Sequence, residues 1–261
     1  MMRLDLAVSV LFVLAGIAFS VPPGRSGQAN VFEELFSVPL AEDEAAFVYL
    51  GYSSFLVRTA KGTLIIDPAD LLKDEDLKHF SGKKVDAILY THGHYDHFEA
   101  STARGLFQAT GAIICGEEEA LRPLMSGSKI PADKIIALAP GRSQAVGPFT
   151  ITAVRGKHVG PIILFHIQAN GIGIFHGGDS AYVPLKNLKA GLAFVPAGEP
   201  SPTASPEDAL KMAQELGASV LVTMHGSDSQ YRQLTAKVKS ALPAASMIIP
   251  QKLKLNVVKI R

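Results

Sequence analysis

A histidine-rich segment at residues 91–97 constrains the fold and chemistry of this chain more than any other feature. It reads Thr-His-Gly-His-Tyr-Asp-His and follows an apolar run at 85–90 that predicts a buried strand. Its four ligand-type side chains are spaced i, i+2, i+4 and i+5, a pattern that no single helix face presents. A tight loop at the carboxyl end of a strand can present all of them, because Gly93 allows a sharp backbone turn. Such loops are where α/β sheets bind ligands.

The side chains of this loop are typical metal ligands. Imidazole and carboxylate groups bind zinc and related divalent ions. A solvated turn, or a histidine held in the core, explains a single such residue better than it explains four at this spacing. We therefore predict metal binding by His92, His94, Asp96 and His97.

Length and composition narrow the class of protein. The chain has 261 residues, of which 48% are hydrophobic and 19% charged, so it can bury a large core. The formal net charge is +1 and no basic cluster is present in the sequence, so we expect no nucleic-acid partner. The single cysteine, Cys115, excludes an internal disulfide, and its apolar neighbours predict that it is buried.

The N-terminus has the layout of a secretory signal peptide. Arg3 precedes an apolar run at 6–19, which is followed by small residues and chain breakers. Cleavage after Ser20 or Ala29 would suit the small-residue rule, so residues 1–29 are predicted to be a signal peptide with a mature N-terminal arm. We expect an exported protein, periplasmic or secreted. The alternative is an uncleaved segment that anchors the protein in the membrane.

Hydrophobic periodicity predicts a mixed α/β fold. Lys61-Gly62 and Asn170-Gly171 are typical hairpin turns, and residues 31–40 fit either a short helix or an extended arm. The predicted strands are 47–50, 54–58, 63–68, 85–90, 112–115, 134–138, 149–155, 162–168, 172–175, 192–195 and 219–223, with further β-like segments at the end of the chain. The predicted helices are 70–80, 99–109, 117–125, 206–216 and 230–242.

Three more potential ligands follow predicted strands. His158 comes after the strand at 149–155, Asp179 after that at 172–175, and His225 after that at 219–223. Each by itself is more often a capping or core residue. Because all three leave strand ends, one edge of a sandwich could gather them around the histidine loop.

The segment His92-Gly93-His94-Tyr95-Asp96-His97 resembles the HxHxDH signature of the metallo-β-lactamase superfamily. The superfamily continues with a lone His, an Asp in a Gly-Asp pair and a final His, and this order is filled over residues 45–230. The resemblance implies a four-layer αββα sandwich that forms one domain at 30–261. It also implies two divalent ions, zinc in the first place, with manganese or iron as alternatives. The implied ligands are His92, His94 and His158 for one ion, Asp96, His97 and His225 for the other, and Asp179 as the bridge.

The same resemblance implies a metal-dependent hydrolase. A hydroxide bound by two metal ions would cleave an ester, lactone, amide or phosphodiester bond of a small molecule. Asp96 would return a proton to the leaving group, and Asp67 would support the histidine loop from behind. A non-catalytic, metal-bearing binding or sensor protein of the same fold is the alternative. His166 and His79 are predicted to be structural, whereas His176 is a candidate to line the site.

Several positions depart from the patterns of the superfamily. Asp179 stands where zinc β-lactamases carry a cysteine, and the flanking segments resemble a compact branch that includes lactonases and hydrolases of unassigned substrate. That branch often has His at the place of Tyr52 and Ser at the place of Val159, and it usually has a Gly-Gly pair near 196–200. These positions lie where a substrate would be held. The sequence therefore names neither the substrate nor the oligomeric state.

Overall fold

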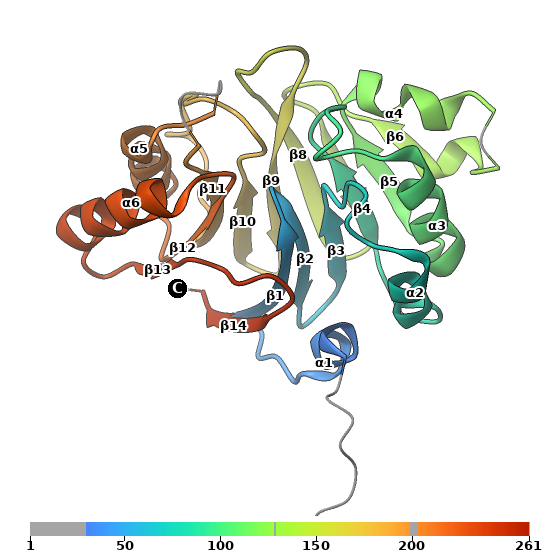
Figure 1. The fold of residues 1–261 in the computed structure, drawn as a ribbon, viewed down its shortest axis with the longest axis horizontal. Helices are drawn as coiled ribbons and strands as arrows, with labels where there is room; N and C mark the ends of the chain where they lie inside the picture. The colour runs from blue at the N-terminus through green and yellow to red at the C-terminus, as the bar shows by residue number, and fades with distance from the viewer. Residues whose placement is uncertain (1–29, 128, 199–202, 261) are drawn as a thin grey trace, which may run out of the picture.

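The computed structural model describes residues 30–127, 129–198 and 203–260. Two seven-stranded sheets pack face to face, and helices cover the outer face of each (Figure 1). This arrangement confirms the predicted four-layer αββα sandwich. The predicted signal peptide lies outside the described residues, and so export stays a prediction.

The first sheet has the strand order β14-β1-β2-β3-β4-β5-β6. Its strands from β14 to β3 pair antiparallel, whereas those from β3 to β6 pair parallel. The strands are β1 (Glu44–Gly51), β2 (Ser54–Thr59), β3 (Thr63–Ile66), β4 (Ala87–Tyr90), β5 (Ile113–Gly116), β6 (Ile135–Ala137) and β14 (Leu255–Lys259).

The second sheet repeats this plan in the order β13-β12-β11-β10-β9-β8-β7. Strands β10 to β13 are parallel and strands β7 to β10 are antiparallel. The strands are β7 (Ser143–Val146), β8 (Phe149–Arg155), β9 (Ile163–Ala169), β10 (Ile172–His176), β11 (Leu192–Pro196), β12 (Val220–Met224) and β13 (Ser246–Ile248).

The core lies between the sheets because strand side chains alternate between the two faces. Phe47 points into the inter-sheet core, while its neighbour Val48 packs beneath the helices of the first sheet. Phe194 from the second sheet meets Phe47 and Phe55 from the first, at ring-centroid distances of 5.4 and 4.3 Å. These aromatic contacts join the two sheets across the core.

The helices cover the outer faces. The first sheet is covered by α1 (Val31–Ser37), α2 (Asp74–Leu77), α3 (Ala100–Thr110) and α4 (Glu118–Met125), and the second by α5 (Pro206–Leu216) and α6 (Asp228–Ala241); two short 3₁₀ helices are η1 (Lys78–Phe80) and η2 (Ala132–Lys134). Helix α5 begins and ends as predicted, since the Ser205 hydroxyl accepts a hydrogen bond from Asp208 N–H and Gly217 is left-handed. Among the described residues no helix has the length and apolarity that a membrane crossing requires.

Two local predictions differ from the structure. The helix predicted at 70–80 is wrong in its first part, because Lys73 is extended and the α-helix begins only at Asp74. The short strand β7 was not predicted, since its Ser-Gln-Ala-Val sequence is half polar and lacks a strand-like pattern. The sequence left residues 31–40 undecided between a short helix and an extended arm. The structure shows helix α1 in this segment, and Asn30 caps its first turn.

Candidate metal centre

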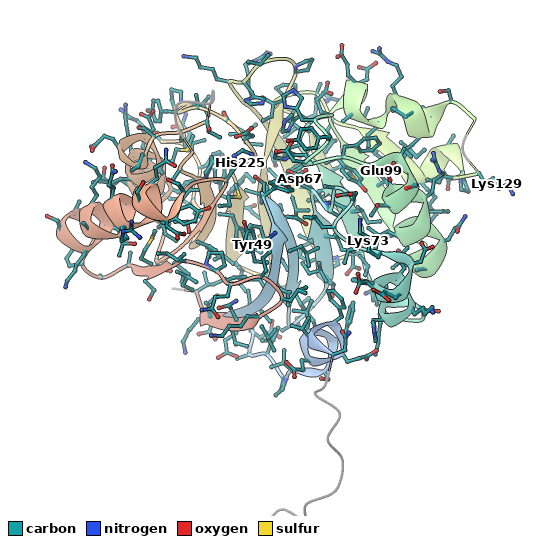
Figure 2. All side chains as sticks on the ribbon, in the orientation of Figure 1. Tyr49, Asp67, Lys73, Glu99, Lys129 and His225 are labelled. Carbon is teal, nitrogen blue, oxygen red and sulfur yellow. The ribbon has the colours of Figure 1, made fainter. Side chains whose placement is uncertain are left out.

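One edge of the sandwich gathers every residue that the sequence proposed as a ligand. The histidine loop follows β4, and Asp67 follows the neighbouring parallel strand β3, so both lie at the same edge. The second sheet contributes His158 after β8, Asp179 after β10 and His225 after β12. Asp67 and His225, which follow strands of opposite sheets, are labelled in the upper central part of Figure 2.

The donor atoms form two adjoining groups. Within each group, one donor atom of every residue lies within 4.8 Å of the others. The first group is His92, His94, His158 and Asp179, and the second is Asp96, His97 and His225. This division matches the two predicted ligand sets, with Asp179 in the position of the shared carboxylate. That these residues bind metal ions stays a prediction.

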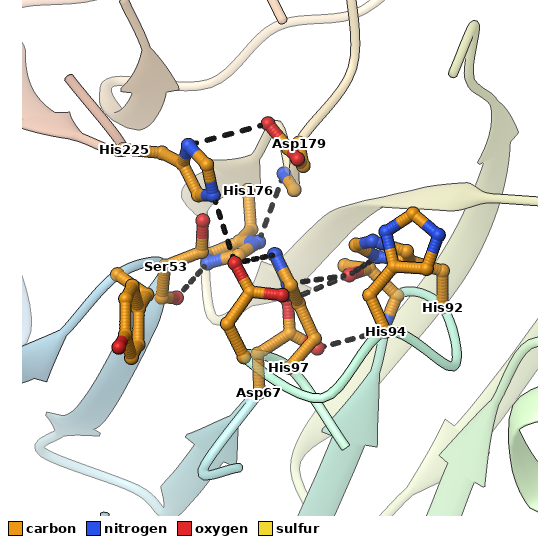
Figure 3. Close-up of polar contacts among 12 residues, drawn as sticks. Ser53, Asp67, His92, His94, His97, His176, Asp179 and His225 are labelled. Carbon is orange, nitrogen blue, oxygen red and sulfur yellow. Dashed lines mark hydrogen bonds and ion pairs between the residues drawn. The ribbon is translucent and has the colours of Figure 1, made fainter. Parts of the chain in front are cut away.

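The distances between donors agree with shared coordination (Figure 3). His158 Nε2 lies 3.2 Å from His94 Nδ1 and 3.4 Å from Asp179 Oδ2. In the second group His225 Nε2 lies 3.1 Å from Asp96 Oδ2, while its Nδ1 lies 3.4 Å from Asp179 Oδ1. Two donors on a tetrahedral zinc ion are about 3.3 Å apart, since each is about 2.0 Å from the metal. Asp179 therefore reaches both groups at once.

Buried polar atoms that make no hydrogen bond provide a test of whether metal ions fit this site. His92 Nε2, His97 Nε2 and Asp179 Oδ1 are buried and make no hydrogen bond within the described structure. Such atoms are rare in folded proteins because each one loses its hydration. The other such atoms in the described residues are the hydroxyl oxygens of Ser53, Ser54 and Tyr90, which lie outside the donor groups. The three ligand atoms all belong to the two donor groups, and so these residues fit a pair of divalent ions.

Asp67 and Thr91 orient the buried imidazoles. Asp67 Oδ2 accepts a hydrogen bond from His97 Nδ1 at 2.8 Å, and Asp67 Oδ1 accepts one from Thr91 N–H at 2.7 Å. The Thr91 hydroxyl donates to Asp67 and lies 3.1 Å from His92 Nδ1, from which it accepts. With both Nδ1 atoms donating, the Nε2 atoms carry the free lone pairs. Asp67 thus lies behind the histidine loop, as its predicted supporting role requires. The contact of Thr91 with His92 was not predicted from the sequence.

The electrostatics favour neutral imidazoles as ligands. Burial, followed by the neighbouring imidazoles, lowers the pKa of His92 well below its usual value. Burial and then His158 lower the pKa of His94. A neutral imidazole keeps the lone pair that a metal ion needs.

The pKa values of the Asp179 and Asp96 carboxyl groups shift in opposite directions. Burial raises the pKa of Asp179, against the opposing pull of nearby imidazoles. Burial also acts to raise the pKa of Asp96, but the hydrogen bond from His225 and the nearby His97 and His225 imidazoles together outweigh it and lower that pKa to about 2. Burial acts to lower the pKa of His225, but the same hydrogen bond and the charges of Asp179 and Asp96 together raise it. The contact between Asp96 and His225 therefore couples the two groups, and a bound metal ion would replace it.

His176 supports the site from behind. It is fully buried, and its Nε2–H donates to the Ser53 carbonyl at 2.8 Å, while its Nδ1 accepts from Gly178 N–H at 3.2 Å. It thus ties the first sheet to the turn that carries Asp179. The only sequence signal for this role is its position before the Gly-Gly-Asp turn.

The two remaining histidines lie outside the donor groups. His79 contacts Asn30 Nδ2 at 3.0 Å and Glu33 Oε1 at 3.4 Å, both near the start of α1. His166 donates from Nε2 to the Lys189 carbonyl at 2.8 Å. These contacts agree with structural roles for both histidines, which stay a prediction.

Comparison with known proteins places the chain in a family. The family described as Beta-lactamase superfamily domain matches residues 46–225, a range that includes both donor groups. A UPF0173 metal-dependent hydrolase of Shouchella clausii is 30% identical over 200 residues, covering 68% of this chain and 83% of the relative. Another of that name, from Koribacter versatilis, is 27% identical over 199 residues, covering 68% and 82%.

Solved structures agree in fold. Igni18, a metallo hydrolase from Ignicoccus hospitalis, has a TM-score of 0.67 at 20% identity, covering 84% of this chain and all of its own. The metallo-beta-lactamase fold protein YhfI from Bacillus subtilis has a TM-score of 0.66 at 17% identity, covering 83% and 100%. The family match, the relatives and the shared fold show that this chain is a member of the metallo-β-lactamase superfamily.

Proposed function

We propose that this protein uses two divalent ions to hydrolyse an ester, lactone, amide or phosphodiester bond of a small molecule. The observation that carries the proposal is the pair of adjoining donor groups, in which three buried ligand atoms have no hydrogen bond. At the coarser level the protein is a metal-dependent hydrolase of the metallo-β-lactamase fold, as its relatives from Shouchella clausii and Koribacter versatilis are named.

The ligand set supports separate roles for the metal ions and for the side chains that would hold them. When bound, two divalent ions activate a water molecule as the nucleophile and polarise the bond that breaks. The neutral imidazoles leave most of the ions' positive charge in place, whereas Asp96 and Asp179 reduce it. We propose zinc as the metal because imidazole and carboxylate ligands suit it, with manganese or iron as the alternatives.

Asp96 is the candidate that moves a proton. Its low pKa means that it is ionised before substrate arrives, so it can accept a proton from the attacking water and pass it to the leaving group. The test is the pH–rate profile of Asp96→Asn. Loss or displacement of the acidic limb of kcat/KM supports this role, and an unchanged profile shape contradicts it.

Metal stoichiometry tests the proposal directly. We expect about two ions per chain by elemental analysis of protein purified without chelator. We expect His92→Ala to hold fewer, and His79→Ala, which changes a histidine outside the donor groups, to match the wild type. Hydrolysis of 4-nitrophenyl esters should stop on addition of a chelator and return with metal. Two bound ions without hydrolysis of ester, lactone, amide or phosphodiester substrates would favour a binding or sensor protein.

We also propose that the protein is exported, on the basis of the apolar run at 6–19 behind Arg3. Fractionation of expressing cells, with N-terminal sequencing of the exported protein, tests this. Cleavage after Ser20 or Ala29 is expected, whereas an uncleaved protein in the membrane fraction would indicate an anchor.

A further inference from the structure

A cavity of about 540 Å³ opens beside the metal centre. His225, a member of the second donor group, forms part of its wall. The rest of the wall includes three tyrosines, Tyr49, Tyr52 and Tyr231, and one lysine, Lys252. Among the described residues, none that lines the cavity carries a carboxylate. The described lining is therefore aromatic, and Lys252 gives it a positive charge.

Lys252 supplies the positive charge. Its Nζ lies 5.9 Å from the centre of the Tyr52 ring, within the range of a cation–π contact. Within the part of the chain that the structure describes, no carboxylate pairs with this ammonium. The backbone next to it is anchored, because Leu253 N–H donates to the Tyr49 carbonyl at 2.9 Å. A cation without a carboxylate partner at the wall of a cavity favours a negatively charged ligand.

Tyr231 adds a hydrogen-bond donor. Its hydroxyl oxygen accepts from Gly226 N–H at 2.9 Å, which leaves its own proton available for an acceptor on a ligand. Burial, and with a smaller effect the nearby Asp228 carboxylate, raise the pKa of this hydroxyl, so the proton stays in place at neutral pH. The Tyr49 hydroxyl, by contrast, donates to the Tyr52 carbonyl at 3.2 Å. Tyr231 and Lys252 are thus the groups that can face an anion.

The backbone around the cavity is held in unusual conformations. Tyr52 and His225 both have φ of 48°, and Leu253, which follows Lys252, has φ of 54°. Non-glycine residues adopt such angles at a cost, and they concentrate at functional sites. The Tyr52 carbonyl also accepts from His225 N–H at 3.2 Å, which joins the cavity wall to the metal centre. The Tyr52 side chain is 43% exposed, so its ring offers a flat face to a ligand.

We infer that this cavity binds the substrate of the adjoining metal centre, and that the substrate is a small organic acid with a flat apolar part. Its carboxylate would contact Lys252 and Tyr231, its flat part would stack on Tyr52, and its ester or lactone bond would lie toward His225. This inference rests on the proposed hydrolase function, because it assigns a substrate class to that site.

A pair of matched esters tests the inference. The probes are the mono-4-nitrophenyl ester of glutaric acid, which carries a carboxylate, and 4-nitrophenyl pentanoate, which is similar in length but neutral. The measured quantity is the ratio of kcat/KM for the charged ester to that for the neutral one. We expect Lys252→Met to lower the ratio about five- to tenfold, as loss of a charge-assisted contact does. Lys254→Met, an exposed lysine outside the cavity lining, is the matched control and should keep the wild-type ratio. An unchanged ratio in Lys252→Met overturns the inference.

A binding measurement separates this inference from the proposed function. The probes are the 4-nitroanilides of glutaric and pentanoic acid, titrated calorimetrically into metal-loaded protein. If the esters are not hydrolysed, but the acidic anilide binds more weakly to Lys252→Met than to Lys254→Met, the cavity is supported while hydrolysis fails. The inference is overturned if the acidic anilide binds equally to both variants. It is also overturned if this anilide binds to none of the three proteins, the wild type included.

Discussion

His97 Nδ1 donates a hydrogen bond to Asp67 Oδ2 over 2.8 Å, and both side chains are completely buried. The contact joins the end of β3 to the loop after β4 and fixes the tautomer of His97. It therefore leaves His97 Nε2 as a lone-pair donor that faces the second donor group.

Replacing Asp67 should weaken metal binding without removing a ligand. We expect Asp67→Asn to reduce metal affinity about 10- to 100-fold, because the loss of a carboxylate partner lowers the basicity of a ligating imidazole. Competition with a chromophoric chelator measures the affinity. Asp70→Asn, which changes an exposed carboxylate three residues later, is the control. Equal affinities of the two variants would contradict this role of Asp67.

His176 should link stability to metal affinity. His176→Leu leaves the Ser53 carbonyl and the Gly178 N–H unpaired, and we expect a loss of about 1–3 kcal/mol in the free energy of unfolding for each buried group. Because Gly178 precedes Asp179, metal affinity should also fall, by about tenfold. Urea unfolding and chelator competition measure the two effects.

The matched control for His176 is His166→Leu. His166 also lies on the second sheet and also binds a backbone carbonyl, that of Lys189, but it is not in either donor group. The His166→Leu protein should lose stability while it keeps the metal affinity of the wild type. A parallel loss of affinity in both variants would show that the effect of His176 on metal binding is general destabilisation.

Metal removal should lower thermal stability. An ion at a free concentration of about 100 times its Kd stabilises the folded state by about 2.7 kcal/mol per site. For a chain of this size that corresponds to a rise of about 5–10 °C in Tm per occupied site. Calorimetry of the chelator-treated and zinc-loaded protein measures the shift. His92→Ala should show a smaller shift, and no shift in the wild type would argue against the site.

Cys115 should be chemically inert in the folded protein. Its side chain is buried, and burial raises the pKa of its thiol to about 12. Since the thiolate is the reactive form, a raised pKa means that reactivity is lost at all pH values below about 12 and rises only toward that pH. We expect no labelling by a disulfide reagent at pH 8 and one thiol per chain in guanidinium chloride. Rapid labelling under native conditions would show that the strand opens.

Much of the fold could be predicted from local pattern. Alternating and continuous apolar runs identified nearly all of the strands, and cap residues such as Ser205 and Gly217 marked the ends of α5. Prediction failed where the local pattern is weak, as in the half-polar β7, or where a neighbouring turn overrides it, as at Lys73. The four-layer arrangement came from resemblance, because periodicity does not say which sheets pack together.

The sequence by itself determined the chemistry of the site, because the ligand types and the short spacing from His92 to His97 are local properties of the chain. Only the tertiary structure decided which distant residues complete it. His225 meets Asp96 across 129 positions and His158 meets His94 across 64, contacts that depend on the packing of two sheets. The role of the Thr91 hydroxyl and the cavity at Lys252 could not be predicted from the sequence for the same reason. Both depend on contacts with residues that are distant in the sequence.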